Sequence, residues 1–273
     1  MDPQLAAPHG ATESVEMGDT PDLQRLRRAY ETSRPRHRPQ LRRALRALKR
    51  LLDEPDQTQN AFEVGYALDG DLAEKKLTRL LACPAGRSVF REKPCLLTAL
   101  CDQQALRSLP ANSFGRAYLE HIDRYGLDPA KLVQLRRETD PQHAERDDDL
   151  RWLIERDDLN HDLWHTLSGY GADGRGEGAL LAFTLAQTYT RSGTLLTLGA
   201  SSRLAQLVGP SWLPYLWRAW RRGHNAVHLC ALPYERLLPL PLERVRQLAN
   251  IEDPKTAHKN GVLRDPDPPT PPN

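Results

Sequence analysis

Hydrophobic residues recur in this chain at intervals of three and four positions, which is the spacing of one face of an α-helix. The first clear case is a stripe of leucines on an otherwise basic segment: Leu41, Leu45, Leu48 and Leu52. Pro39 suits a helix start, and Glu54-Pro55 indicates its end. Strict two-residue alternation, typical of half-buried strands, is rare. The pattern therefore predicts an all-α protein.

The same periodicity predicts further helices, most of them separated by proline or glycine, at residues 57–68, 72–82, 86–92, 95–106, 113–125, 129–137, 148–169, 176–191, 194–208, 214–229 and 242–251. Short connections favour a single compact multi-helix domain over residues 37–253. Residues 1–36 are expected to be a disordered or variable segment, and residues 254–273, which end in DPDPPTPPN, a disordered proline-rich tail.

Composition narrows the class of protein. The chain has 38 basic and 36 acidic residues, so it lacks the basic excess of a nucleic-acid-binding protein. Its four cysteines show no CxxC spacing and read as free thiols in a reducing compartment. Residues 1–20 contain acidic side chains but no Lys or Arg, the opposite of a mitochondrial presequence. These features favour the cytoplasm of a bacterium.

The segment with a recognisable chemistry is HDLWH, residues 161–165. His161 and His165 are four positions apart and share one helix face, and Glu177 follows a glycine-rich turn. A helical hairpin can bring Glu177 back towards His165, so the three residues can form a metal-binding hairpin. Two histidines and one carboxylate leave coordination positions open, as in catalytic sites, and suit zinc or Fe(II). Asp162 is rotated by about 100° from His161; it is either a further ligand or a carboxylate that orients a histidine.

Other interpretations of these residues remain open. Histidine pairs at this spacing are usually incidental, and the helix dipole alone favours Glu177 in a first turn. The zinc-protease motif HExxH does not apply, because Asp162 occupies its glutamate position. An all-helical HD-type phosphohydrolase would need His121 or His143 upstream and Asp173 downstream, and no specific signal ties those residues together.

Residues 160–188, NHDLWHTLSGYGADGRGEGALLAFTLAQT, resemble the signature of the coenzyme Q biosynthesis protein 4 family: His-Asp, two residues, His, a loop and Glu. Weaker similarity covers about residues 37–252, including segments 43–58, 113–118 and 222–246. The resemblance implies that His161, Asp162, His165 and Glu177 bind a divalent metal, with zinc expected and iron an alternative. It also implies a role in ubiquinone biosynthesis, acting on polyprenylated hydroxybenzoate or quinone-like lipids and organising other enzymes of the pathway.

Two functions follow from the resemblance. The first is metal-dependent C1 decarboxylation of a polyprenyl-hydroxybenzoate, either simple or oxidative with hydroxylation. For this reaction Asp162 is the catalytic candidate, as a proton shuttle or as a group that orients a histidine. A Lewis-acid metal stabilises the charge that departing CO2 leaves on the ring. The second is a non-catalytic prenyl-lipid-binding scaffold that presents intermediates to partner enzymes, with the metal structural.

A lipid substrate calls for apolar surfaces. Residues 179–198 begin at the hairpin and either line a path for the prenyl tail or form ordinary core. The basic helix at 41–52 and the cluster of Trp212, Trp217 and Trp220 with neighbouring arginines suit either peripheral contact with the cytoplasmic face of the inner membrane or packing on the core. A homodimer is also expected.

Overall fold

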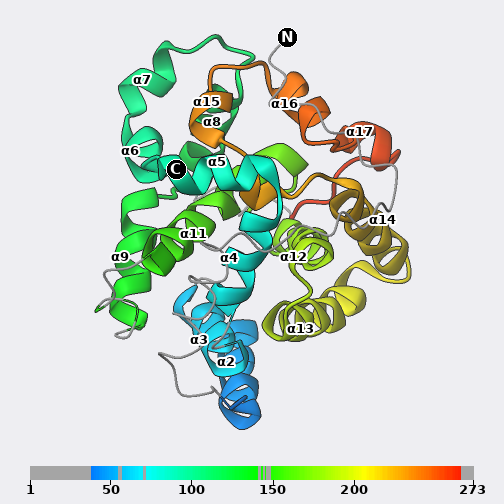
Figure 1. Cartoon of the computed structure of the whole chain (residues 1–273). Coiled ribbons are helices and arrows are strands. Elements are labelled where there is room, and N and C mark those ends of the chain that lie inside the picture. The colour runs from blue at the N-terminus through cyan, green and yellow to red at the C-terminus, as the bar shows by residue number, and fades with distance from the viewer. Residues whose placement is uncertain are drawn as a thin grey trace, which may run out of the picture.

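The computed structural model describes residues 38–54, 57–69, 72–140, 143, 145 and 149–265. Over these residues the chain is helical, and its one β-type pairing is an isolated bridge between Ser113 and Pro241. The expected all-α fold is confirmed (Figure 1). The helices, in chain order, are α2 (Leu41–Asp53), α3 (Gln59–Leu68), α4 (Leu72–Ala82), α5 (Pro84–Glu92), α6 (Leu96–Cys101), α7 (Gln103–Ser108), α8 (Phe114–Tyr125), α9 (Pro129–Thr139), α11 (Asp149–Ser168), α12 (Gly174–Thr188), α13 (Arg191–Val208), α14 (Trp212–Asn225), the 3-10 helix η1 (Leu229–Ala231), α15 (Tyr234–Leu237), α16 (Leu242–Leu248) and α17 (Pro254–Ala257).

Helices α11 and α12 form the expected hairpin. Helix α11 ends before Gly169, whose φ of 78° is the left-handed conformation that glycine adopts without strain. Helix α12 begins at an Asp173 cap, whose carboxylate accepts a hydrogen bond from the Gly176 amide at 3.1 Å. The turn between the helices is therefore set by residues at its two ends, and it places the first turn of α12 beside the last turns of α11.

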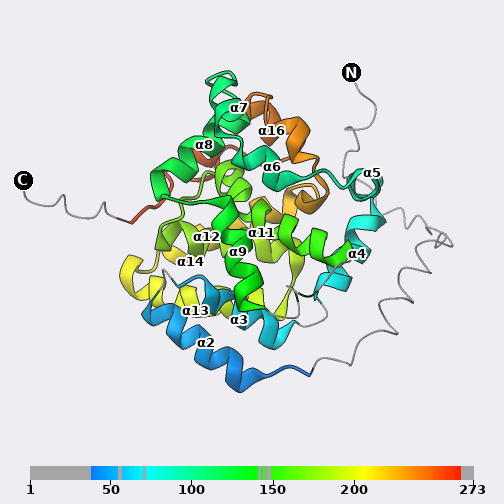
Figure 2. The ribbon, with the colours of Figure 1, turned by 90° about the vertical axis from the view of Figure 1, so that its left-hand side faces the viewer.

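The main core surrounds the hairpin. Leu163 and Leu167 of α11, Leu180 and Phe183 of α12, and Trp212 of α14 belong to one buried cluster. Helix α12 packs closely on α14, because Gly223 lets the two backbones approach. Helices α2 and α3 pack on each other and on α13, and lie together at one end of the molecule in both ribbon views (Figure 1, Figure 2). The site hairpin thus sits on a buried framework.

Several expected boundaries are wrong. The expected helix over residues 95–106 is two helices, because Asp102 interrupts the first and caps the second by accepting a hydrogen bond from the Ala105 amide. Helix α14 ends at Asn225 and does not reach residue 229, and the short helices α15 and α17 were not expected.

The expected disordered tail is wrong for residues 254–265. Pro254 and His258 are buried, and the Asp265 amide donates to the Asp173 carboxylate at 3.0 Å. These residues pack against the hairpin turn, which the proline-rich sequence did not indicate. The segments 1–36 and 266–273, for which disorder was expected, lie outside the described residues.

Candidate metal centre

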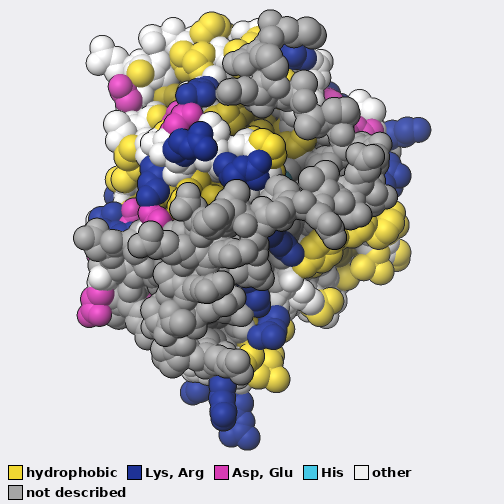
Figure 3. Space-filling view, in the orientation of Figure 1, with side chains coloured by type: hydrophobic (Ala, Val, Ile, Leu, Met, Phe, Trp, Pro, Cys, Tyr) yellow, Lys and Arg dark blue, Asp and Glu magenta, His cyan; other side chains and the backbone are white. Residues whose placement is uncertain are grey.

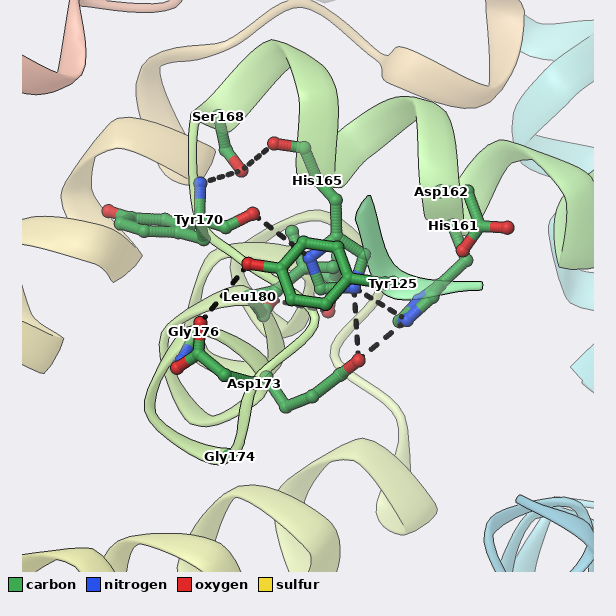
Figure 4. A network of polar contacts seen from close by, with 12 residues as sticks. Tyr125, His161, Asp162, His165, Ser168, Tyr170, Asp173, Gly174, Gly176 and Leu180 are labelled. Carbon is green, nitrogen blue, oxygen red and sulfur yellow. Dashed lines mark hydrogen bonds and ion pairs between the residues drawn. The ribbon is translucent and has the colours of Figure 1, made fainter. Parts of the chain in front are cut away.

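Three side chains of the hairpin converge on one point. The Nε2 atom of His165 lies 3.1 Å from Nε2 of His161 and 3.1 Å from a carboxylate oxygen of Glu177 (Figure 4). His161 Nε2 lies 3.5 Å from the other Glu177 oxygen. Among the described residues these three form the one group with the ligand types and mutual distances of a metal site. The structure therefore brings together three of the four ligands expected from the sequence.

The backbone after α11 sets the orientation of His165. Its side chain is fully buried, and Nδ1 lies 3.2 Å from the carbonyl oxygen of Tyr170. A carbonyl oxygen only accepts, so Nδ1 carries the proton and donates it. Nε2 is then left with a free lone pair directed at His161 and Glu177. This backbone contact fixes the tautomer and the ring orientation that a metal-binding histidine needs.

The spacing of the three ligand atoms fits a bound ion. Two nitrogen or oxygen atoms at about 2.1 Å from one ion are separated by about 3.0–3.4 Å when the angle between their bonds is 90–110°. The two observed separations of 3.1 Å fall within this range, and the third, of 3.5 Å, lies just above it. The donor set of two imidazoles and a carboxylate suits zinc and Fe(II) alike. The residues present therefore fit the expected metal and leave coordination positions for other ligands.

The pKa values of the Glu177 carboxyl group and of the His161 imidazole depend on one another. Partial burial by itself would raise the pKa of Glu177. When protons occupy the Nε2 positions in place of a metal, however, the charge of His165 and hydrogen bonds from both histidines outweigh burial and hold this pKa well below its usual range. Burial opposes protonation of His161, yet the hydrogen bond and charge of Glu177 raise its pKa to about 9. Glu177 is thus anionic, and a cation at this point replaces protons on the imidazoles.

Asp162 lies beside the group but outside it. It is 8% exposed, and burial raises the pKa of its carboxyl against the opposing charges of His161 and His165. Its role as ligand or proton shuttle stays a prediction. Near it is the buried hydroxyl of Tyr118, which has no hydrogen-bond partner and whose pKa is raised first by burial and then by the charge of Asp162.

The residues required by an HD-type phosphohydrolase have other contacts. Asp173 caps α12 and accepts from Asp265, and His143 lies 3.4 Å from the Glu155 carboxylate. His121, in contrast, is at the site: its ring lies parallel to that of His165, with centroids 5.2 Å apart and an interplanar angle of 21°. The sequence suggests His121 only as a residue of this alternative enzyme, because nothing in its local sequence connects α8 with the hairpin.

The apolar segment after the hairpin contributes to the core mainly through its first part, in α12. Leu180 and Phe183 are fully buried in the main cluster, and Leu195 and Leu196 pack on the cluster that α2 and α3 form. Leu198, however, is 64% exposed. Within the described part of the chain, none of the helices combines the length and apolar character that crossing a bilayer requires.

Fold and site together define an all-helical protein with a candidate His-His-Glu metal centre. A family model described as "Coenzyme Q (ubiquinone) biosynthesis protein Coq4" matches residues 41–255, which include the whole site. The chain belongs to this family of ubiquinone biosynthesis proteins.

Individual relatives agree with this assignment. The mitochondrial ubiquinone biosynthesis protein COQ4 of Clavispora lusitaniae is 28% identical over 208 residues, which cover 73% of this chain and 61% of that protein. The mitochondrial COQ4 homolog of Bos taurus is 30% identical over 175 residues, covering 63% and 62% of the two chains. The chain thus spans less than two thirds of the length of these relatives.

A solved structure shares the fold. A crystal structure of a Nostoc punctiforme protein, assigned by its description to ubiquinone biosynthesis, superposes with a TM-score of 0.53 at 22% sequence identity. The match covers 78% of this chain and 98% of the other.

Proposed function

We propose that this chain removes the C1 carboxyl group of a polyprenyl-hydroxybenzoate in ubiquinone biosynthesis, with a divalent metal held by His161, His165 and Glu177. The observation that carries the proposal is the convergence of three ligand atoms at 3.1–3.5 Å in a member of this family. The side chains of His161 and Glu177 are 39% and 40% exposed, whereas that of His165 is buried. The group is therefore anchored on one side and open to a substrate on the other.

The reaction breaks the bond between the ring and the carboxyl carbon. CO2 leaves, the bonding electron pair stays on the ring carbon, and a proton replaces the lost group. The bound metal supplies Lewis-acid stabilisation of the charge that develops on the ring and its oxygen. His165 holds its ring fixed through Tyr170, and Glu177 supplies the negative charge that retains the cation. Asp162 is the neighbouring carboxyl group that we assign to orienting His161 or carrying the proton.

The decisive experiment supplies purified protein with a substrate labelled with ¹³C at the carboxyl carbon and measures labelled CO2. We expect release only after Zn²⁺ or Fe²⁺ is restored to metal-stripped protein, and none from His165→Ala. Asp162→Asn is expected to keep the metal and lower the rate by roughly 10²–10⁴-fold if it moves the proton. His224→Ala, an exposed histidine of α14, is the control that keeps full activity. Incorporation of ¹⁸O from O2 into the product would identify the oxidative form of the reaction.

A second candidate function is lipid presentation without catalysis. Its support is the apolar surface of α13 and α14, where Leu207, Leu213 and Trp217 are 59–67% exposed. Apolar side chains gather in this part of the molecule (Figure 3), and Arg218 and Arg221 lie on the same helix α14. Exposed aromatic and leucine side chains beside arginines suit the boundary of an anionic bilayer. We propose peripheral membrane contact through this face, where the protein would meet prenyl-lipid intermediates and partner enzymes of the pathway. We also propose that the chain forms a homodimer.

Two measurements test these proposals: the first tests membrane contact, and the second separates catalysis from the scaffold function. We expect the wild type to sediment with phosphatidylglycerol vesicles. The double variant Leu213→Glu/Trp217→Glu is expected to sediment more weakly. Equal sedimentation of the two proteins would contradict the proposed membrane contact. Ubiquinone production in cells that carry only His165→Ala tests the scaffold. If ubiquinone persists while the folded variant has lost its metal, the catalytic proposal is wrong and the scaffold is supported.

A further inference from the structure

We propose that His121 is a third imidazole ligand of the metal centre, joining His161, His165 and Glu177. The inference rests on the proposed metal site and goes beyond it, because it adds a ligand from a different helix. Its basis is the position of His121 on α8, the burial of its Nε2 atom and the placement of its ring against His165.

The last turn of helix α8 is fixed to the hairpin of α11 and α12. The hydroxyl of Tyr125 accepts a hydrogen bond from Arg264 at 2.8 Å and lies 3.4 Å from the Asp173 carboxylate, which caps α12 (Figure 4). His121 is four residues before Tyr125, so both side chains project from the same face of α8. Their ring centroids are 5.0 Å apart. The contacts of Tyr125 therefore hold His121 over the hairpin.

The Nε2 atom of His121 is buried and has no hydrogen-bond partner. Buried polar atoms in native proteins are normally partnered, so an orphaned nitrogen calls for an explanation. His165 does not donate to it, because its Nδ1 faces the Tyr170 carbonyl and its Nε2 faces His161 and Glu177. A cation shared with the trio is the partner that these surroundings lack.

The ring separations are compatible with shared coordination. Two imidazoles on one ion, with bonds of about 2.1 Å at angles of 90–110°, place their centroids about 4.5–5.3 Å apart. The centroids of His161 and His165 are 4.7 Å apart, and those of His121 and His165 are 5.2 Å apart. His121 lies outside the group whose ligand atoms are all within 4.8 Å of one another. Binding therefore requires the His121 ring to move towards the other three ligands, and its broad χ2 torsion allows the ring to turn.

A fourth protein ligand has a chemical consequence. A tetrahedral ion held by three histidines and one glutamate has no open position, as in closed structural sites. A substrate could then bind only if the coordination number of the ion rises, to five for Zn²⁺ or to five or six for Fe(II), Co(II) or Mn(II). The ligand count at His121 therefore bears on which metal supports chemistry in this chain.

The test uses X-ray absorption of the full chain, stripped of metal and reloaded with one equivalent of Co²⁺. We expect scattering from three imidazoles in the wild type and two in His121→Phe, which keeps a ring against His165 but has no nitrogen. The visible d–d bands of Co²⁺ are expected to change in the variant, because water replaces an imidazole nitrogen on the ion, and the dissociation constant is expected to rise more than about tenfold. His143→Phe, a buried histidine that pairs with Glu155, is the matched control and should leave all three readouts unchanged.

The outcomes are distinct. Two imidazoles in both wild type and His121→Phe would overturn the role of His121 and leave the metal site intact, even if affinity fell. Failure of the wild type to bind Co²⁺ would overturn the metal centre itself, and with it the proposed function. Circular dichroism of the metal-free proteins checks folding; should His121→Phe not fold, His121→Gln provides the same comparison of ligand number.

Discussion

Glu235 of α15 accepts two hydrogen bonds from the guanidinium of Arg156 in α11, at 2.5 and 3.1 Å. The Arg156 side chain is 2% exposed, and it also donates to the Leu232 carbonyl. The pair joins the helix that carries both metal-site histidines to a segment nearly 80 residues later. Arg156 lies five residues before His161, so the pair holds the middle of α11 in place.

We expect Glu235→Ala to destabilise the protein by about 3–5 kcal/mol, because removing one partner leaves the Arg156 charge buried and uncompensated. Urea unfolding followed by circular dichroism measures this change. Glu92→Ala is the control, since Glu92 pairs with Arg236 on the surface, and it should cost no more than about 1 kcal/mol. Equal losses in the two variants would mean that the buried pair contributes no more than a surface pair.

A second prediction concerns the close approach of α12 and α14. A Cβ atom at Gly223 would lie 2.0 Å from the Phe183 carbonyl oxygen, and the obstacle is backbone. Gly223→Ala is therefore expected to force the helices apart and to lower the free energy of unfolding by about 1–3 kcal/mol or more. Gly65→Ala in α3, where a Cβ meets nothing within 4 Å, should instead stabilise by about 0.5–1 kcal/mol. Thermal unfolding of both variants distinguishes a steric limit from a general effect of glycine replacement.

A third prediction concerns metal binding and stability. A ligand that binds only the folded state stabilises it by about 2.7 kcal/mol at one hundred times its dissociation constant. Zn²⁺ is therefore expected to raise the melting temperature of the wild type and to have little effect on Glu177→Gln, which lacks the anionic ligand. Glu120→Gln, at an exposed position of α8, serves as the control. An equal shift in Glu177→Gln would show that the cation binds elsewhere.

The sequence predicts those parts of the site that depend on local geometry. His161 and His165 share a face because they are four residues apart, and a short capped turn returns Glu177 to them. His121 could not be assigned to the site, because its approach depends on how α8 packs against α11, some 40 residues later in the chain. The pairing of Arg156 with Glu235 is long-range in the same sense.

The C-terminal segment differs from the sequence-based expectation for another physical reason. Its proline content and polarity predict an extended chain, but a few specific contacts decide its structure. The buried His258 hydrogen-bonds the Tyr170 hydroxyl at 2.9 Å, and Arg264 reaches Tyr125. Composition does not reveal such contacts, because they depend on partners that the fold alone brings near.

The buried His258 also predicts how stability depends on pH. Burial, followed by the positive charges of Arg222 and Arg218, lowers its pKa from 6.5 to about 4, and its ring packs against Tyr215. The unfolded chain therefore takes up a proton near pH 6.5, whereas the folded protein does so only near pH 4. Stability that is present above pH 6.5 is lost as the pH falls towards 4, by up to about 2–3 kcal/mol.

His258→Gln isolates this contribution, because glutamine can still hydrogen-bond the Tyr170 hydroxyl but does not titrate. The free energy of unfolding is measured with urea at pH 7 and pH 4.5. We expect it to fall between these pH values by about 2 kcal/mol less in the variant than in the wild type. Other acid-sensitive groups act equally in both proteins and cancel in the comparison. His224→Gln, at an exposed position, should show the wild-type dependence. If His258→Gln and the wild type lose the same stability on acidification, protonation of the buried His258 ring is not what destabilises the packed C-terminal segment.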